Sequence, residues 1–379
     1  LLPALAPDGR VALLEALGER GDRSAKPAVL RAVESPEPKV RAAALRALGA
    51  LGGPEDLPVL AEKAGRGTPP EQASARQAML KLRGEKLNQA ILEVLNSAGP
   101  EARAELLRLL AARKATETVP VVLRHTAHPE SSTRLAAWAG LQVLAGEKDL
   151  PAMLQQLGFA REDDERGTAE DALAAVCGRS GQGCVNILLE RLAQADASGR
   201  QVLLRLLAGT GAAKALETVN ARLKDEDASV REQAWRLLSN WPNRAAAVHL
   251  LKAGRETTNA VHKTLALRGI VRLAGAEEPA DSGLLGQAWS LAQQTEDKRL
   301  VVGALGGANT PAALALALQA LASAELAPEA ALATVMIAEK LPPGHAAAAR
   351  QALENVARVA KEPGIRERAE KRLKTLDAK

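Results

Sequence analysis

One helical pattern recurs along the whole chain. The segments KVRAAALRALG (39–49), SVREQAWRLLSNW (229–241) and GIRERAEKRLKTL (364–376) each place an apolar residue before an arginine and continue with apolar residues three or four apart. This spacing puts the apolar side chains on one face of a helix. Weaker copies follow Arg76, Arg103, Arg134, Arg200, Lys263 and Lys298. Each copy leads into a glycine-rich turn and a second apolar helix, which predicts about eleven helix–turn–helix repeats.

The composition favours helices over strands. Hydrophobic residues make up 47% of the 379 residues, but there is no tyrosine and only one phenylalanine, so Ala, Leu and Val must build the core. Ala and Leu favour helices, whereas aromatic residues favour strands. Such a composition is typical of a GC-rich bacterial genome or of a redesigned sequence. We therefore expect an all-α, right-handed α-solenoid, one continuous array over 1–379 with capping repeats near 1–34 and 364–379.

The repeat resembles the HEAT repeat, in the short form that also occurs in phycobilin-lyase-like arrays. An acid followed by VR, the A-x-x-AL spacing and GGPEDLPVL (52–60) carry the resemblance. HKTLALRGIVRLAG (262–275) with DKRLVVGALGGANTPAALALA (297–317) is similar to arrays in large bacterial extracytoplasmic proteins. The resemblance implies stacked helix pairs with a concave groove, and it favours an extracytoplasmic over a cytoplasmic location. Because the chain opens on Leu1, we expect it to be a piece of a larger protein.

An acid stands four residues before the repeated arginine in five repeats. The pairs are Glu37/Arg41, Glu130/Arg134, Asp196/Arg200, Asp227/Arg231 and Glu362/Arg366. One interpretation is an ion pair between residues four apart at a helix start. In the other, the acid caps its own helix while the arginine reaches the neighbouring repeat. Both interpretations make these five arginines a structural ladder.

A second basic column stands five residues after most of the repeated basic residues. It consists of Arg46, Lys81, Arg108, Arg205, Arg236, Arg268 and Lys371, here called the basic stripe, and Ala139 and Gly303 interrupt it. The position lies nearly opposite the apolar face, so it must be exposed. The HEAT resemblance places it on the concave side, where it would attract an acidic protein, a polyanionic glycan or phosphate. The alternative is that these side chains only solvate an exposed helix position.

The two cysteines flank a predicted turn. Cys177 and Cys184 are separated by GRSGQG (178–183), between two predicted helices. Helix ends joined by a short turn bring Cβ atoms within the reach of a disulfide. An extracytoplasmic protein would use the bond as a staple, whereas a cytosolic one would keep two buried thiols.

No residue pattern predicts bond chemistry. His125 and His128 have the spacing of two metal ligands, but no cysteine or carboxylate pair completes a site. The run Glu162–Glu165 lacks the alternating ligands of a calcium loop and reads as a solvated loop. Trp138 and Trp235 take core positions of the repeat, and Trp241 is expected to be partly open at a helix end. We expect no catalytic residues, no metal and no cofactor.

The charge balance limits the partners. The formal net charge is only +5, whereas nucleic-acid binders concentrate far more positive charge, and no apolar run is long enough to cross a membrane. We expect a non-catalytic interaction scaffold, a monomeric array that binds a protein partner, in particular an acidic one, along the groove. The HEAT resemblance leaves two alternatives: a phycobilin-lyase-like enzyme subunit that cradles a prosthetic group, and a nucleic-acid-binding HEAT protein.

Overall fold

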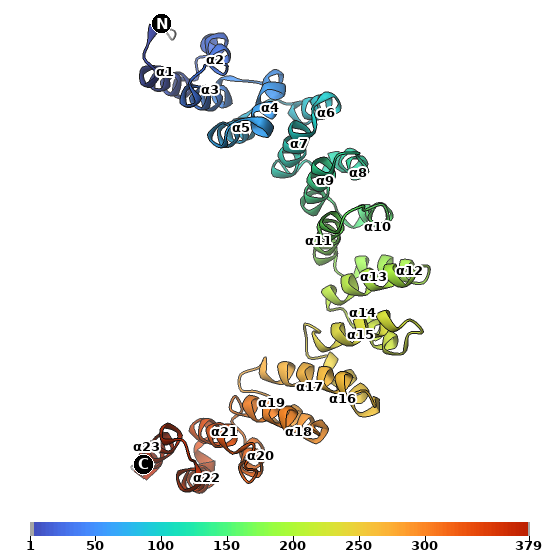
Figure 1. Ribbon diagram of the computed structural model, residues 1–379, viewed down its shortest axis with the longest axis vertical. Coiled ribbons are helices and arrows are strands. Elements are labelled where there is room, and N and C mark those ends of the chain that lie inside the picture. Colours follow the sequence, from blue (N-terminus) through green and yellow to red (C-terminus); the bar gives the residue numbers. More distant parts are fainter. Residues whose placement is uncertain (1–3, 378–379) are drawn as a thin grey trace. The chain divides into compact units, whose positions relative to one another are not determined.

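The computed structural model describes residues 4–377, and every regular element in this range is a helix (Figure 1). The first three and last two residues of the expected capping repeats lie outside the described residues. The chain divides into two compact units, Leu1–Ile187 and Leu188–Lys379. The single continuous array stays a prediction, and each unit is described by itself.

The first unit contains eleven complete α-helices and the start of a twelfth. They are α1 (Pro7–Arg20), α2 (Lys26–Ala32), α3 (Pro38–Leu51), α4 (Leu57–Arg66), α5 (Pro69–Lys81), α6 (Leu87–Ser97), α7 (Pro100–Ala112), α8 (Val119–His125), α9 (Ser131–Leu144), α10 (Leu150–Leu157), α11 (Asp163–Ser180) and α12 (Gln182–Leu192). Four 3₁₀ turns precede α2, α4, α8 and α10: Arg23–Ala25, Pro54–Asp56, Thr116–Thr118 and Glu147–Asp149.

The second unit continues the same alternation. Its helices are α13 (Ala197–Thr210), α14 (Ala213–Ala221), α15 (Ala228–Ser239), α16 (Ala246–Glu256), α17 (Ala260–Gly275), α18 (Ser282–Leu291), α19 (Thr295–Leu305), α20 (Pro311–Leu321), α21 (Ala327–Lys340), α22 (Ala346–Val359) and α23 (Pro363–Asp377), with 3₁₀ turns at Arg222–Lys224 and Pro343–His345. The described helices thus form eleven consecutive pairs and one final helix.

Within each unit the helices stack in two layers. In the first unit, α1, α3, α5, α7, α9 and α11 pack one on the next, and α13, α15, α17, α19, α21 and α23 do so in the second. We call each of these rows the odd layer of its unit. Even-numbered helices pack behind them, as in α4 on α6 and α18 on α20 (Figure 1). This alternation is that of an α-solenoid, in which each repeat covers the apolar face of its neighbours.

The sequence fixes the turns between paired helices through short polar contacts. In GGPEDLP, the Asp56 carboxylate accepts a hydrogen bond from the Gly53 amide at 2.8 Å, and Asp149 binds the Gly146 amide in the same way at 2.9 Å. In the second unit, Asp281 caps α18 by accepting from the Leu284 amide at 3.0 Å. In each case a carboxylate satisfies a backbone amide at the start of a helix, which would otherwise lack a partner.

The core follows the apolar face of the repeat. Leu45, Leu48 and Trp138 are fully buried, and Trp235 is nearly so. The expectation that Trp241 lies partly open is wrong, because its side chain is also fully buried. Arg272 of α17 donates to the Trp241 carbonyl at 2.5 Å, which ties this segment to the next repeat.

None of the helices in the described range has both the length and the hydrophobicity that a membrane-spanning segment needs.

Candidate interaction surface

The helix boundaries define a common position for the repeated basic residue. It is the fourth residue of its odd helix in α3, α7, α9, α13, α15, α17, α19 and α23. Arg10 in α1 and Arg166 in α11 take the same position. The sequence pattern did not select these two arginines, which follow Gly9 and Glu165.

Helix α5 departs from this frame. It begins at Pro69, where the Thr68 amide donates to the Glu71 carboxylate at 3.1 Å. Arg76 is therefore the eighth residue of α5, and Gln72 is the fourth. Lys81, assigned to the basic stripe, lies at the thirteenth and last position of the helix, one turn beyond the other members.

Four of the five arginines of the predicted ladder close the turn before their own helix. Arg41 Nη1 donates to the carbonyls of Ser35 and Pro36 at 2.8 and 2.9 Å. The same bonds to the residues six and five positions earlier recur at Arg134 (3.1 and 2.7 Å) and Arg231 (2.6 and 2.9 Å), and Arg366 binds the carbonyl six residues earlier at 2.7 Å. One guanidinium thereby satisfies carbonyls that the preceding turn leaves without a donor.

Three of the five ladder arginines reach the next repeat. Arg41 Nε lies 2.5 Å from Glu71 Oε1, and Arg134 Nε lies 2.9 Å from Glu165 Oε2. Both acids are the third residue of the next odd helix. Arg200 lies 3.6 Å from Asp225. Among the described residues, Arg231 and Arg366 have no such carboxylate partner.

The acids four residues earlier do not pair with these arginines in the described range. Asp196 instead accepts from the Gly199 amide at 2.7 Å, and Asp227 accepts from the Ser229 and Val230 amides at 2.9 and 3.1 Å. Hydrogen bonds from Ser229 and Val230 hold the pKa of Asp227 below its ordinary value. These two acids therefore cap their helices while the arginine contacts other elements.

A second row of inter-repeat contacts lies at the opposite ends of the odd helices. Here a basic side chain donates back to a carbonyl that ends the preceding odd helix: Arg179 to Ala145 (2.9 Å), Arg272 to Ser239 (3.2 Å), Lys340 to Gly306 (3.1 Å) and Arg372 to Glu339 (3.3 Å). For Arg179, Arg272 and Lys340 the sequence signal was a basic residue in the last helical turn, whereas Arg372 lies before the last turn of α23. The two rows together fix the register of neighbouring repeats.

The basic stripe lies on the solvent side of the odd layers. Except for Lys81, its members are the ninth residue of their helices, and none is buried. In the first unit, Arg46 lies 2.8 Å from Glu15, the ninth residue of α1, and Arg108 lies 2.6 Å from Glu105. Glu105 also pairs with Arg76 at 2.8 Å. Acids within the odd layer therefore pair with Arg46 and Arg108 in this unit.

The second unit differs in charge. Within the described residues, no carboxylate pairs with Arg236 or Arg268, both of which are exposed. The nearest acid in sequence, Glu232, accepts from His262 Nε2 at 2.7 Å, and the His262 ring stacks on Trp235. The first unit has equal numbers of basic and acidic residues, so the whole excess of +5 lies in the second.

In a cleft between the turns of the first unit, the charged side chains neutralise one another. It has a volume of about 490 Å³ and is lined by three acids and three bases. These pair with one another: Arg41 with Glu71 at 2.5 Å, Lys63 with Glu34 at 2.9 Å, and Arg66 with Glu62 at 3.3 Å. The cleft therefore offers no net charge to a ligand.

The two neighbouring histidines take structural roles. The rings of His125 and His128 stack with centroids 6.1 Å apart, and the Glu130 amide donates to His128 Nδ1 at 3.1 Å. Burial, followed by the charge of Arg103, lowers the pKa of His128, which favours the neutral ring that can accept this bond. Within residues 4–377 no group of three metal-ligating side chains converges. Of the acidic run, Glu165 and Glu162 bind Arg134.

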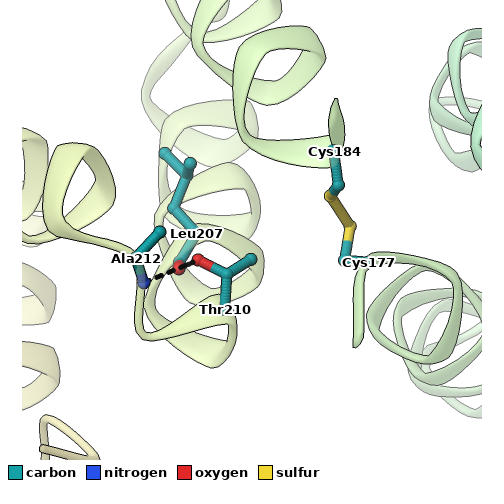
Figure 2. Close-up of a disulfide and its surroundings, with 5 residues drawn as sticks. All are labelled: Cys177, Cys184, Leu207, Thr210 and Ala212. Atoms are coloured by element: carbon teal, nitrogen blue, oxygen red, sulfur yellow. Dashed lines mark hydrogen bonds between the residues drawn. A yellow bond between two sulfur atoms is a disulfide. The ribbon is translucent and has the colours of Figure 1, made fainter. Parts of the chain in front are cut away.

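The structure joins Cys177 and Cys184 by a disulfide, with their Cα atoms 5.3 Å apart (Figure 2). The turn between them is shorter than expected. The two helices extend through most of GRSGQG, so α11 ends at Ser180, α12 begins at Gln182, and Gly181 alone, at φ 58°, forms the link. A positive φ is accessible to glycine without steric cost, which permits this tight hairpin.

Reducing the disulfide is expected to destabilise the first unit by about 2 to 3 kcal/mol, because the bond closes a short loop and restricts the unfolded chain. Thermal unfolding with and without a reductant measures the effect. A Cys177→Ala/Cys184→Ala variant is the control and should not respond to the reductant. Equal midpoints for the oxidised and reduced wild-type protein would contradict the prediction.

Comparisons with known proteins agree with this architecture. A family model described as HEAT repeats matches residues 1–80. No curated protein matches the sequence. Among solved structures, Kap121p bound to Nup53p has a TM-score of 0.57 at 14% identity, and Kap121p bound to Ste12p has 0.56 at 13%; each match covers 98% of this chain and 47% of Kap121p. Kap95p in a RanGDP complex has 0.52 at 12%, covering 96% and 58%.

The stacked pairs and these neighbours define an all-α solenoid, and its first 80 residues match the HEAT-repeat family model. It spans about half the length of the Kap121p chains that it matches. At 12 to 14% identity the structural likeness carries the fold and nothing further. The phycobilin-lyase part of the expected resemblance stays an expectation.

Proposed function

We propose that this chain is a non-catalytic protein-interaction scaffold, which binds its partner along a groove formed by an odd layer. The observation that carries the proposal is the row of exposed side chains at the ninth position of successive, mutually packed helices. Such a row offers equivalent contacts at regular intervals, which suits the recognition of an extended partner by shape and charge.

The solved neighbours lend support by analogy. Structures of Kap121p are described as complexes with Ste12p, Nup53p and RanGTP, so an α-solenoid of this type serves there as a binding surface for proteins. We extend the same use to this chain, as a monomeric array. The disulfide supports an oxidising, extracytoplasmic compartment, since such bonds persist there.

Selection from a displayed peptide library on the folded chain tests the scaffold proposal. The selected peptides should lower amide hydrogen exchange in odd helices, because the bound segment covers the odd-layer face. The even helices provide the internal control and should exchange as in the free protein. Protection restricted to even helices, or an absence of saturable binders, would contradict the proposal.

A further inference from the structure

The odd layer of the second unit has two kinds of exposed side chain in successive helices. Arg236 and Arg268 are the ninth residues of α15 and α17; we call them the arginine track. Leu265, Leu300 and Leu332 are the sixth residues of α17, α19 and α21; we call them the leucine row. Leu300 and Leu332 are 39% and 40% exposed, and Leu265 is half-buried.

These positions lie on one solvent-facing ridge of each helix. The sixth and ninth residues of a helix are three apart and therefore neighbours on its surface. The helices α13, α15, α17, α19 and α21 pack in order, so the track and the row lie on the same layer and meet at α17. Gly303, the ninth residue of α19, has no atom near its missing Cβ and leaves the ridge open beside Leu300.

The arginine track has charge to offer a partner. No carboxylate in the described range pairs with Arg236 or Arg268, and the acid one turn before Arg236 is held by His262. By contrast, Arg46 and Arg108, the corresponding arginines of the first unit, form ion pairs with Glu15 and Glu105. Because the excess positive charge also lies in the second unit, this face is complementary to a negatively charged segment.

The spacing of the helices selects the form of that segment. Helices packed in one layer lie about 8 to 10 Å apart. A chain in the extended polyproline II conformation advances about 3.1 Å per residue with three residues per turn, so every third side chain lies on the same side and three residues span one helix spacing. Carboxylates at every third residue of an extended peptide therefore match successive arginines, whereas adjacent carboxylates can reach only one of them.

We propose that the odd layer of the second unit binds an extended acidic segment of a partner protein, with carboxylates at every third residue on the arginine track and an apolar residue beyond them on the leucine row. The proposal rests on the scaffold function proposed above and names its partner chemistry. The carboxylates set specificity and association rate, and the apolar contact adds buried area.

A nucleic acid fits this face less well. Single-stranded binding uses aromatic side chains on which bases stack. The tryptophan on this layer, Trp235, is 4% exposed and covered by the His262 ring, and Trp241 is fully buried. The exposed apolar side chains beyond the arginine track, on α19 and α21, are Leu300 and Leu332, which fit an apolar side chain of a peptide.

Fluorescence anisotropy with the full chain tests the proposal. The labelled probe has glutamates at every third position and one leucine beyond them, made with the leucine at either end. The control peptide has the same composition with adjacent glutamates. The better of the two probes should bind about tenfold more tightly than the control peptide, and its affinity should fall as salt is raised.

Matched variants locate the site. Arg236→Gln/Arg268→Gln should weaken probe binding by about tenfold or more, whereas Arg46→Gln/Arg108→Gln should leave it unchanged because those arginines serve internal acids. A variant with Arg236→Glu/Arg268→Glu should instead bind a peptide in which lysines replace the glutamates. This gain of binding separates a charge contact from a loss of folding.

Three results would overturn the proposal: equal affinity for the probe and the control peptide, no effect of the Arg236 and Arg268 changes, or tighter binding of a single-stranded oligonucleotide than of the probe. The scaffold function fails separately. If library peptides without spaced acids still protect the odd helices from exchange, the scaffold stands and only the acidic partner is wrong.

Discussion

Replacing Arg134 with methionine is expected to lower the free energy of unfolding of the first unit by about 3 to 5 kcal/mol. The Arg134 and Glu165 side chains are 2% and 1% exposed and lie 2.9 Å apart. Methionine keeps most of the apolar stem but removes the charge, so the Glu165 carboxyl group would be left buried and without its counter-ion. The carbonyls of His128 and Pro129 would also lose their donor.

Urea unfolding followed by circular dichroism measures this loss. Arg46→Met is the matched control, because it makes the same chemical change at an exposed pair, in which Arg46 and Glu15 are 40% and 50% exposed. Its expected cost is below about 1 kcal/mol, since surface ion pairs contribute little. Equal losses of unfolding free energy for the two variants would contradict the prediction, because they would show that burial does not increase the contribution of the Arg134 contact.

A double variant separates a net contribution from a penalty. Breaking a buried pair leaves an uncompensated charge, whereas replacing both partners with apolar groups is often close to neutral. Arg134→Met combined with Glu165→Leu should therefore recover much of the stability that Arg134→Met loses. If the double variant is as unstable as the single one, the carbonyl contacts of Arg134 outweigh its ion pair.

The sequence was sufficient to predict the fold because the information is local and repeated. The pattern around Arg41 and Arg231 places Leu48 and Leu238 on one helical face, and both are buried. A helix with such a face must pack against a neighbour, and a similar helix follows about thirty residues later. Helix class, pairing and the core were therefore readable from spacing alone.

The side-chain contacts of the candidate surface were harder to predict from the sequence, because they depend on where each helix starts and on the register between neighbouring repeats. Proline and an acid open α5 at Pro69, seven residues before the Arg76 that the pattern selects, so Lys81 fell outside the common position. The partner of Arg134 lies 31 residues away, and only the stacking of α9 on α11 brings it near. For the same reason, the neutralisation of Arg46 by Glu15 could not be read from the stripe.

The second large effect is expected at Gly269, where α17 approaches α15 closely. A Cβ atom at this position would lie 2.8 Å from the Ser239 carbonyl oxygen and 2.9 Å from the Ser239 Cα. Both are backbone atoms of the preceding repeat, so the helices must separate to admit a methyl group. Gly269→Ala is expected to destabilise the second unit by about 1 to 3 kcal/mol, although alanine is the better helix former.

The same substitution at Gly303 is expected to act in the opposite direction. Gly303 lies in α19 of the same unit, and nothing lies within 4 Å of its missing Cβ. Alanine there gains helix propensity without meeting a neighbour, so Gly303→Ala should stabilise the unit by about 0.5 to 1 kcal/mol. Urea unfolding of both variants measures the opposite changes in stability, and stabilisation by both would mean that α15 and α17 are not in close contact.

Because repeats in a solenoid interact mainly with their neighbours, faster amide exchange in Gly269→Ala should concentrate in α15 and α17.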